Sequence, residues 1–347
     1  MRSGAVKNLL YSSLRHVHYL RGIAKSRSFQ LKVFITGAAG FIGSTLTDRL
    51  LAQGHEVTGY DNFSTGQRRF LENALSTASF RLEESDLLDM ERLGRAMAGA
   101  EFVYHLGANA DVRFGTQHTR HDLEQNTIAT WNVLEAMRRN NVRRVVFSST
   151  GSIYGEPGIF PTPETCPFPS QTSLYGASKL AAEGLIEAYA EGFGMQAWIF
   201  RFVSILGERY SHGHVFDFYK QLLEHSDSLH ILGDGMQRKS YLHVQDCVSA
   251  MLHAIERPAE NVHIFNLGTD EYCQVNDSIR WICGYLGLNP TLTYSGGQRG
   301  WPGDSPFIFL DCSKIRALGW QPELSIQQGI IRTIQYLERN RWLLESR

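Results

Sequence analysis

A tyrosine and a lysine four positions apart, Tyr175 and Lys179, are the side chains of this sequence best suited to acid–base chemistry. On a helix, this spacing places the phenol and the ammonium on one face. A free tyrosine has a pKa of about 10 and is a poor base at neutral pH, but a neighbouring cation favours the phenolate and lowers that pKa. Thr150 precedes the tyrosine by 25 residues and can hydrogen-bond the same substrate hydroxyl. These three residues predict a site that removes and returns a hydroxyl proton.

The elements around these residues follow the pattern of an α/β protein. Short apolar, β-rich runs alternate with segments of helical period, which favours parallel strands joined by right-handed crossovers, with helices on both faces. Such sheets bind ligands at the carboxyl ends of their strands, where Thr150 is expected. We therefore predict a Rossmann-type doubly wound parallel sheet with helices at 41–53, 123–140 and 174–193 and strands at 31–36, 56–60, 79–83, 101–106, 144–148 and 196–202.

The junction after the first predicted strand has glycines spaced for a dinucleotide phosphate. In GAAGFIG (37–43), Gly37 allows a tight turn, Gly40 lets a pyrophosphate approach the backbone, and Gly43 allows close helix–sheet packing. The phosphates would meet the free N–H groups at the helix N-terminus. Asp61 lies 18 residues after Gly43, where a carboxylate accepts the adenosine ribose hydroxyls and repels a 2′-phosphate. The pattern predicts NAD in preference to NADP.

The chain divides into three expected parts. Residues 31–202 form the NAD-binding Rossmann domain. Residues 203–347 lack regular alternation, and we expect a smaller mixed α/β lobe that binds the substrate, with some segments returning to the sheet and an amphipathic helix at 326–340. Residues 1–30 carry six Lys/Arg and no acidic residue, and we expect a poorly ordered basic extension. A transit peptide or an early start codon would also account for that composition.

Composition narrows the function classes further. The 347 residues carry a formal net charge of −1, which gives no electrostatic reason to expect nucleic acid or an anionic membrane as partner. No apolar run approaches the roughly 18 residues of a membrane helix. Five cysteines without a CxxC pair favour isolated thiols in a reducing cytoplasm. The closest histidine pairs, 118/121 and 212/214, have no third ligand nearby in sequence, so we expect no metal site.

From about residue 31 to its end, the sequence resembles the extended short-chain dehydrogenase/reductases, and among them the NAD-dependent nucleotide-sugar epimerase/dehydratase family. Two motifs, YDNFSTG and the late segment around Asp304, are most similar to those of UDP-glucose 4-epimerases. The resemblance rests on an ordered set of motifs: GAAGFIG (37–43), YDNFSTG (60–66), HLGANADV (105–112), SSTGSIYGE (148–156), SLYGASK (173–179), GDGMQRKSYLHVQD (233–246) and GWPGDSPFIFLDCSK (300–314).

This resemblance implies a role for each matching residue. Tyr175 would be the general base and acid, Lys179 its activator and a ligand of the nicotinamide ribose, and Thr150 the family's Ser/Thr. Asn126 would match an asparagine that helps to order the site. The segments 123–140 and 174–193 would form the family's four-helix-bundle interface, which implies a homodimer, although their apolar faces could equally be ordinary core. Further cofactor contacts are implied at Phe41, Ile42, Asn62, Leu106 and Ala108. Asp86 and Leu87, after the third predicted strand, could contact the adenine, and a helix N-cap at this point is an equal alternative.

The stretch SSTGSIYGE separates the reactions found in this family. Its dehydratases carry acids after the threonine, which remove the C5 proton and protonate the leaving hydroxyl; here Gly151 and Ser152 stand at those positions. Its 3,5-epimerases use a cysteine near this stretch, and none occurs between residues 112 and 165. The resemblance thus implies a nucleotide-sugar 4-epimerase that oxidises C4 transiently and returns the hydride to the opposite face. A 4-reductase, a dehydratase with acids from elsewhere and a non-catalytic NAD-binding module remain alternatives.

The substrate side departs from the family pattern. Lys239 stands where the family has an arginine for the diphosphate, and a lysine offers a point charge without a bidentate fork. Ser204 replaces an asparagine that contacts the diphosphate or the sugar. Arg299 is a second candidate cation five residues before Asp304, whereas the epimerase pattern has its arginine at the position of Trp301. These residues, together with Thr150, are the expected substrate contacts, and their departures leave the nucleotide and the sugar open.

Overall fold

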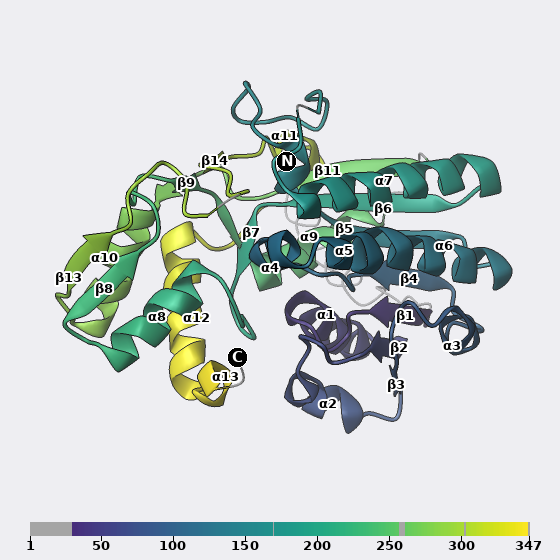
Figure 1. Ribbon diagram of the computed structural model, residues 1–347. Coiled ribbons are helices and arrows are strands. Elements are labelled where there is room, and N and C mark those ends of the chain that lie inside the picture. Colours follow the sequence, from purple (N-terminus) through teal and green to yellow (C-terminus); the bar gives the residue numbers. More distant parts are fainter. Residues whose placement is uncertain (1–29, 169, 257–260, 302, 346–347) are drawn as a thin grey trace, which may run out of the picture.

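A seven-stranded parallel sheet of order β11-β6-β5-β4-β1-β2-β3 is the centre of the computed structural model (Figure 1), which describes residues 30–168, 170–256, 261–301 and 303–345. The predicted basic extension falls almost entirely outside the described residues. The strands of the sheet are β1 (Lys32–Thr36), β2 (Glu56–Asp61), β3 (Phe80–Glu84), β4 (Phe102–His105), β5 (Arg144–Thr150), β6 (Gln196–Phe202) and β11 (Val262–Leu267).

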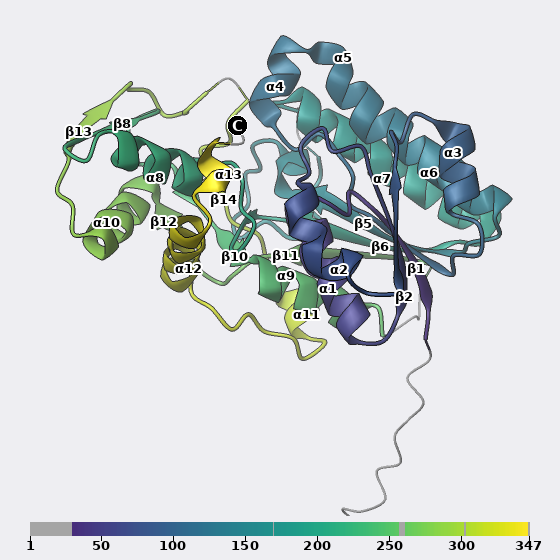
Figure 2. The same cartoon turned by 90° about the horizontal axis from the view of Figure 1, so that it is seen from below.

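Helices cover both faces of this sheet, which confirms the predicted doubly wound α/β fold (Figure 2). Side chains alternate between the faces, so that Val33 and Ile35 of β1 join one hydrophobic cluster while Phe34 joins another. One face carries α3 (Met90–Ala96), α4 (Val112–Gln117), α5 (Thr119–Asp122), α6 (Ala129–Arg139) and α7 (Leu174–Phe193); the other carries α1 (Phe41–Ala52), α2 (Glu72–Leu75), α9 (Val244–Ala254) and α11 (Ser313–Arg316).

A smaller lobe lies beside the carboxyl ends of the strands (Figure 1). In its hydrophobic core, α8 packs against α12. Ile330, Ile334 and Leu337 lie on the face of α12 that enters this core and are fully buried. A capping box between Ser325 and Gln328 starts that helix. The lobe contains α8 (His214–Glu224), α10 (Val275–Leu286), α12 (Ile326–Arg339), α13 (Trp342–Glu345) and three small sheets: β7 (Ser204–Leu206) with β10 (Tyr241–His243), β8 (Ser228–Ile231) with β13 (Thr291–Tyr294), and β9 (Arg238–Lys239) between β12 (Cys273–Gln274) and β14 (Phe307–Ile308).

The seventh strand, β11, comes from the second part of the chain, for which segments returning to the sheet were expected, and it pairs in parallel with β6 at the edge of the sheet. One helix differs in detail from the sequence-based expectation. The helix expected at 123–140 consists of a π-helical turn, η2 (Leu123–Ile128), followed by α6. Short 3₁₀ turns, η1 (Arg68–Leu71) and η3 (Gly151–Tyr154), lie after β2 and β5. Among the described residues, we find no helix long and apolar enough to cross a membrane.

Candidate active site

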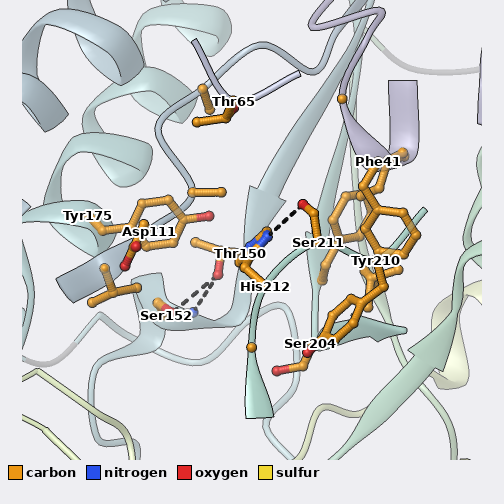
Figure 3. Close-up of a pocket in the computed structure, with 18 of the residues that line it drawn as sticks. Phe41, Thr65, Asp111, Thr150, Ser152, Tyr175, Ser204, Tyr210, Ser211 and His212 are labelled. Carbon is orange, nitrogen blue, oxygen red and sulfur yellow. Dashed lines mark hydrogen bonds between the residues drawn. The ribbon is translucent and has the colours of Figure 1, made fainter. Parts of the chain in front are cut away.

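A cavity of about 520 Å³ lies where the carboxyl ends of the strands face the smaller lobe (Figure 3). Of the residues expected from the sequence to bind cofactor or substrate, most line this one cavity. They are Gly37, Gly40, Phe41, Ile42, Gly43, Asp61, Asn62, Leu87, Leu106, Ala108, Thr150, Tyr175, Ser204, Lys239 and Asp304. Four expected residues do not line it: Asp86, Asn126, Lys179 and Arg299.

The glycine turn between β1 and α1 leaves room that a side chain would fill. Gly37 has a φ of +69°, and a Cβ there would lie 2.7 Å from the backbone nitrogen of Gly107. A Cβ on Gly43 would lie 2.0 Å from the Gly37 carbonyl oxygen, so only glycine lets α1 start so close to the turn. The N-cap, Gly40, makes no side-chain capping bond, and the first turn of α1 lines the cavity. This arrangement suits a pyrophosphate on the helix N-terminus.

Asp61 lies at the end of β2, beside the glycine turn. Its carboxylate accepts the backbone N–H groups of Ala39 and Phe63, each at 2.8 Å, so the side chain is fixed in place. Each carboxylate oxygen still has a lone pair for a ribose hydroxyl. Burial raises the pKa of Asp61, and the two backbone hydrogen bonds oppose that rise. The glycine turn and this carboxylate together fit the adenosine diphosphate half of NAD.

Asp86 lies behind this wall of the cavity. It accepts a hydrogen bond from the Asn62 side chain at 2.7 Å and another from the Leu88 backbone at 2.8 Å. The sequence left a helix-capping role and an adenine contact as equal readings for this aspartate. In the structure it braces Asn62, which lines the cavity itself.

Tyr175 and Thr150 meet on the wall of the cavity. Tyr175 lies in the first turn of α7, which begins at the N-cap Ser173, whose hydroxyl accepts the Gly176 N–H at 3.0 Å. Thr150 ends β5, and its hydroxyl oxygen accepts the Ser152 N–H at 3.1 Å, so the chain turns there into η3. Figure 3 shows the Tyr175 hydroxyl pointing toward Thr150. The strand end and the helix start thus bring together the predicted phenol and hydroxyl.

Lys179 lies one turn beyond Tyr175 on α7, beneath the cavity wall. Its side chain is buried, and its ammonium lies 4.1 Å from the centre of the Phe147 ring. Burial lowers the pKa of Lys179 to about 7, and the charge of Glu183 opposes that fall. Burial raises the pKa of Tyr175 to about 12, while hydrogen bonding with Thr150 lowers it. In the chain alone, the pKa of Tyr175 is therefore raised, opposite to the lowering expected from the sequence.

Asn126 lies outside the cavity lining and hydrogen-bonds α7, the helix that bears Tyr175. It lies in the π-helical turn η2, where its side chain donates to the Ser178 hydroxyl at 2.9 Å and accepts the Asn109 N–H at 2.9 Å. Ser178 directly precedes Lys179, and Asn109 lies in the loop after β4. This geometry accords with the ordering role that the family resemblance implied. A π-helical turn inside a helix is uncommon and often marks a functional site.

The substrate side of the cavity holds the pair formed by Lys239 and Asp304. The Lys239 ammonium donates to the Asp304 carboxylate at 2.6 Å and also to the Ser305 carbonyl. Burial lowers the pKa of Lys239, and Asp304 opposes that fall. Lys239 is the one lysine or arginine among the described residues that line the cavity. A diphosphate would therefore meet a lysine that is already paired.

Arg299, the second predicted cation, is not among the residues that line the cavity. Its guanidinium pairs with Glu156 and donates to the Asp304 carbonyl at 2.9 Å. The sequence predicted that Arg299 contacts the substrate phosphate. In the structure its guanidinium instead pairs with Glu156, outside the lining of the cavity. The reason is competition by a carboxylate that lies 143 residues earlier in the chain and close to it in space.

The cavity also contains polar residues that the sequence did not single out for it. Asp111, in the loop after β4, also lines the cavity. The feature of the sequence that could have pointed to Asp111 is its place in HLGANADV (105–112), a motif that begins at the end of a strand. The opposite wall comes from the segment that leads into α8 and includes Tyr210, Ser211, His212 and His214. The sequence noted the two histidines only as an incomplete metal pair.

The sequence profile of the NAD dependent epimerase/dehydratase family matches residues 33–268. The chain belongs to this family. A UDP-glucose 4-epimerase of Mycolicibacterium smegmatis is 32% identical over 312 residues, which cover 88% of this chain and 98% of that protein. The match confirms the predicted family and agrees with NAD as its cofactor, for which the glycine turn and Asp61 provide a fitting site.

Two solved structures show the same architecture. A crystal structure of a UDP-galactose 4-epimerase superposes with a TM-score of 0.81 and 34% identity, and covers 90% of this chain and 100% of that one. A UDP-glucuronic acid 4-epimerase from Bacillus cereus, in complex with UDP-glucuronic acid and NAD, superposes with a TM-score of 0.82 and 28% identity, and covers 89% and 100% of the two chains. The likeness therefore spans the Rossmann domain and the smaller lobe.

Proposed function

We propose that this protein is an NAD-dependent nucleotide-sugar 4-epimerase acting on a UDP-hexose or a related nucleotide sugar. The observation that carries the proposal is the meeting of Tyr175 with Thr150 on the wall of a cavity that also contains the glycine turn and Asp61. A phenol, a hydroxyl and a dinucleotide site in one cavity suit the oxidation of a secondary alcohol. The 4-epimerases among its relatives and structural neighbours support the same reaction.

The chain's own residues account for the proton transfers. Tyr175, as phenolate, removes the proton of the C4 hydroxyl, and Thr150 hydrogen-bonds that hydroxyl and holds its oxygen in place. When bound beside the glycine turn and Asp61, NAD would supply the acceptor for the C4 hydride and the donor for its return to the opposite face. The Lys179 ammonium stabilises the phenolate by its charge. Tyr175 then gives the proton back to the inverted C4 oxygen, so that the cycle consumes neither protons nor electrons.

The smaller lobe would hold the nucleotide diphosphate while the sugar turns. Lys239 faces the cavity and can interact with phosphate oxygens, whereas the first turn of α8 also brings Asp217 to the cavity. The 4-keto sugar has no bond to the protein and can rotate about this anchor to present its other face. Ser204, which also lines the cavity, is small enough to leave space for that rotation.

Asp111 favours one second candidate, a nucleotide-sugar dehydratase. Dehydration needs an acid to protonate the leaving hydroxyl, and Gly151 and Ser152 supply none next to Thr150. Asp111 brings a carboxyl group into the same cavity from the loop after β4. The epimerase is preferred because Tyr175 and Thr150 suffice for it without an acid.

An assay of purified protein with UDP-, GDP-, dTDP- and CDP-sugars separates the two reactions. We expect inversion at C4, seen by proton NMR as a mixture of two epimeric nucleotide sugars, without added NAD. Accumulation of a 4-keto-6-deoxy sugar would instead establish the dehydratase, and stoichiometric use of added NADH would establish a reductase. If the protein binds NAD but turns over none of these nucleotide sugars, the remaining alternative is a non-catalytic NAD-binding module.

We also propose that the protein is a homodimer built on α6 and α7. Large apolar side chains are exposed along η2 and α6: Leu123 is 51%, Ile128 38% and Trp131 42% exposed. The neighbouring surface of α7 exposes small residues, among them Ala181 and Ala188, which allow close helix packing. A second copy of the chain would cover both helices as a four-helix bundle. Analytical ultracentrifugation should give a dimer for the wild type and a monomer for Trp131→Lys; a monomeric wild type would refute the proposal.

A cytoplasmic location is the third part of the proposal. All five cysteines are buried and free, as expected for a protein of a reducing compartment. Cell fractionation with antibodies against the protein tests it, and recovery from a secreted or organellar fraction would argue against it.

A further inference from the structure

A buried ion pair lies directly beneath the catalytic residues. The guanidinium of Arg201, on β6, donates to Glu183, on α7, from Nη2 at 2.7 Å and from Nε at 3.2 Å. Both side chains are only 3% exposed. Buried pairs of this kind give little net stability compared with well-packed apolar residues. The location of the pair is therefore better explained by what Glu183 does to its neighbours.

Hydrogen bonds connect Glu183 to the strand that carries Thr150. The Ser149 hydroxyl, next to Thr150 on β5, donates to the Glu183 carboxylate. Arg201 Nη1 donates to the Tyr154 hydroxyl at 2.8 Å, and Tyr154 ends the η3 turn that follows Thr150. The network thus joins α7, which bears Tyr175 and Lys179, to the strand and turn that bear their partner Thr150.

The charge of Glu183 acts on Lys179, one helical turn away. Tyr175, Lys179 and Glu183 occupy successive turns of α7. Burial lowers the pKa of Lys179, and Glu183 is the group whose charge raises it. The other strands packed against Lys179 bring an aromatic ring, Phe147 on β5, and an imidazole, His105 on β4, which burial keeps neutral because its pKa falls to about 3.

We infer that Glu183 is a positioning residue that keeps the Lys179 side chain as an ammonium and aligns α7 with Thr150. The inference rests on the proposed function, because it assigns Glu183 a task in priming the Tyr175 phenolate. Asp122, on α5, opposes this priming, since its charge raises the pKa of Tyr175. Arg201, on β6, is bound to the carboxylate of Glu183 and holds it in place.

Glu183 affects where the last proton of the Tyr175–Lys179 pair resides. When the Tyr175–Lys179 pair loses one proton, the remaining one sits either on the amine, giving phenolate and ammonium, or on the phenol, giving phenol and neutral amine. Both forms carry the same number of protons, so pH alone cannot choose between them. Only the first contains the base that the reaction needs. A carboxylate one turn from Lys179 favours the ammonium and hence the active form.

The test compares Glu183→Gln with the double variant Glu183→Gln/Arg201→Met. The single variant keeps the shape of the side chain but leaves the Arg201 cation buried without its partner, which threatens folding. The double variant removes both charges together. In each protein loaded with NAD, ultraviolet difference absorbance follows phenolate formation against pH, and the same titration of Tyr175→Phe is subtracted so that only the Tyr175 signal remains.

For both variants we expect the Tyr175 phenolate to appear roughly one pH unit or more above its wild-type position. We expect kcat for C4 inversion to fall about tenfold or more with KM changed less than about twofold, since Glu183 does not touch the substrate. Ser149→Ala, which removes one hydrogen bond to Glu183 and no charge, should leave the phenolate titration in place. Glu183→Asp keeps the carboxylate on a shorter side chain and should therefore bring the Tyr175 phenolate titration part of the way back to its wild-type position.

One result would overturn the inference: a double variant whose phenolate titration and kcat match the wild type, with only the single variant impaired. Glu183 would then serve merely to neutralise Arg201. The titration needs no sugar, so it also separates this inference from the proposed function. If no nucleotide sugar is turned over and the phenolate still shifts, the proposed reaction is wrong and the role of Glu183 stands.

Discussion

The Lys239 ammonium donates to the Asp304 carboxylate at 2.6 Å within the substrate side of the cavity, with both side chains largely buried. We predict that Lys239→Gln raises KM for nucleotide sugars about 10- to 100-fold, the worth of one charged hydrogen bond to a phosphate, while kcat stays within a few-fold. The matched control is Arg299→Gln. Because Arg299 pairs with Glu156 outside the lining of the cavity, its loss should change KM by less than about threefold. Steady-state kinetics of both variants checks this, and equal effects would mean that Arg299 swings into the site.

The close approach of α1 to its own turn makes Gly43 a test of the cofactor site. A Cβ at this position would lie 2.0 Å from the Gly37 carbonyl oxygen, so Gly43→Ala must push the helix start away from the turn. We predict that purified Gly43→Ala retains much less than one NAD per chain and melts at a lower temperature. The control, Gly94→Ala in α3, has no atom within 4 Å of the new Cβ and should keep its NAD. Full NAD occupancy in Gly43→Ala would disprove the assigned phosphate position.

Burial of a neutral histidine predicts a loss of stability in acid. His105 lies at the end of β4 with one ring nitrogen 2.7 Å from the Thr36 hydroxyl and the other 2.9 Å from that of Thr130. Burial lowers its pKa to about 3 from the ordinary 6.5, so the unfolded chain binds more protons between those values. Its stabilising contribution is complete above pH 6.5 and falls as pH drops toward 3, by up to about 1.4 kcal/mol per pH unit. Urea unfolding at several pH values should show a shallower fall for His105→Gln; identical slopes would rule out this source.

Tyr175 and Asp111 line the same cavity, and the two proposed reactions use them differently. If the enzyme is a 4-epimerase, Tyr175→Phe should lower kcat about 10²- to 10⁴-fold with NAD still bound, the usual worth of a general base. Asp111→Asn should lower kcat less than about tenfold, because no step of C4 inversion needs its acid. Turnover measured with both variants decides between the roles. A loss in Asp111→Asn as large as in Tyr175→Phe would favour the dehydratase.

The sequence predicted the parts of the site that short motifs determine. Gly37, Gly43 and Asp61 could be placed because a tight turn and a strand end fix their positions locally, whatever the rest of the chain does. Tyr175 and Thr150 could be paired because Thr150 lies at the end of a predicted strand and Tyr175 lies at the start of a predicted helix. In each case the residue and the element that positions it lie within a few residues of one another.

The sequence could not predict contacts between distant segments. The spacing predicted a phosphate ligand at Arg299, but no residue near Arg299 in the sequence indicates that its guanidinium pairs with Glu156. The network of Glu183 with Arg201 joins a helix to a strand that follows it, and no periodicity reveals a buried pair. Nor could composition show which segment of the irregular second part returns to the Rossmann sheet, where β11 pairs with β6. The strand depends on pairing with β6, which is a tertiary contact.

The central claim is that the hydrogen on C4 leaves the sugar and returns to the same carbon from the other side. Incubation with UDP-glucose carrying deuterium at C4, in ordinary water, tests it most directly. We predict UDP-galactose that retains the deuterium at C4, with no label in the solvent and no accumulation of NADH. Loss of the deuterium to water, or a product labelled at a different carbon, would contradict direct hydride transfer between C4 and a resident NAD.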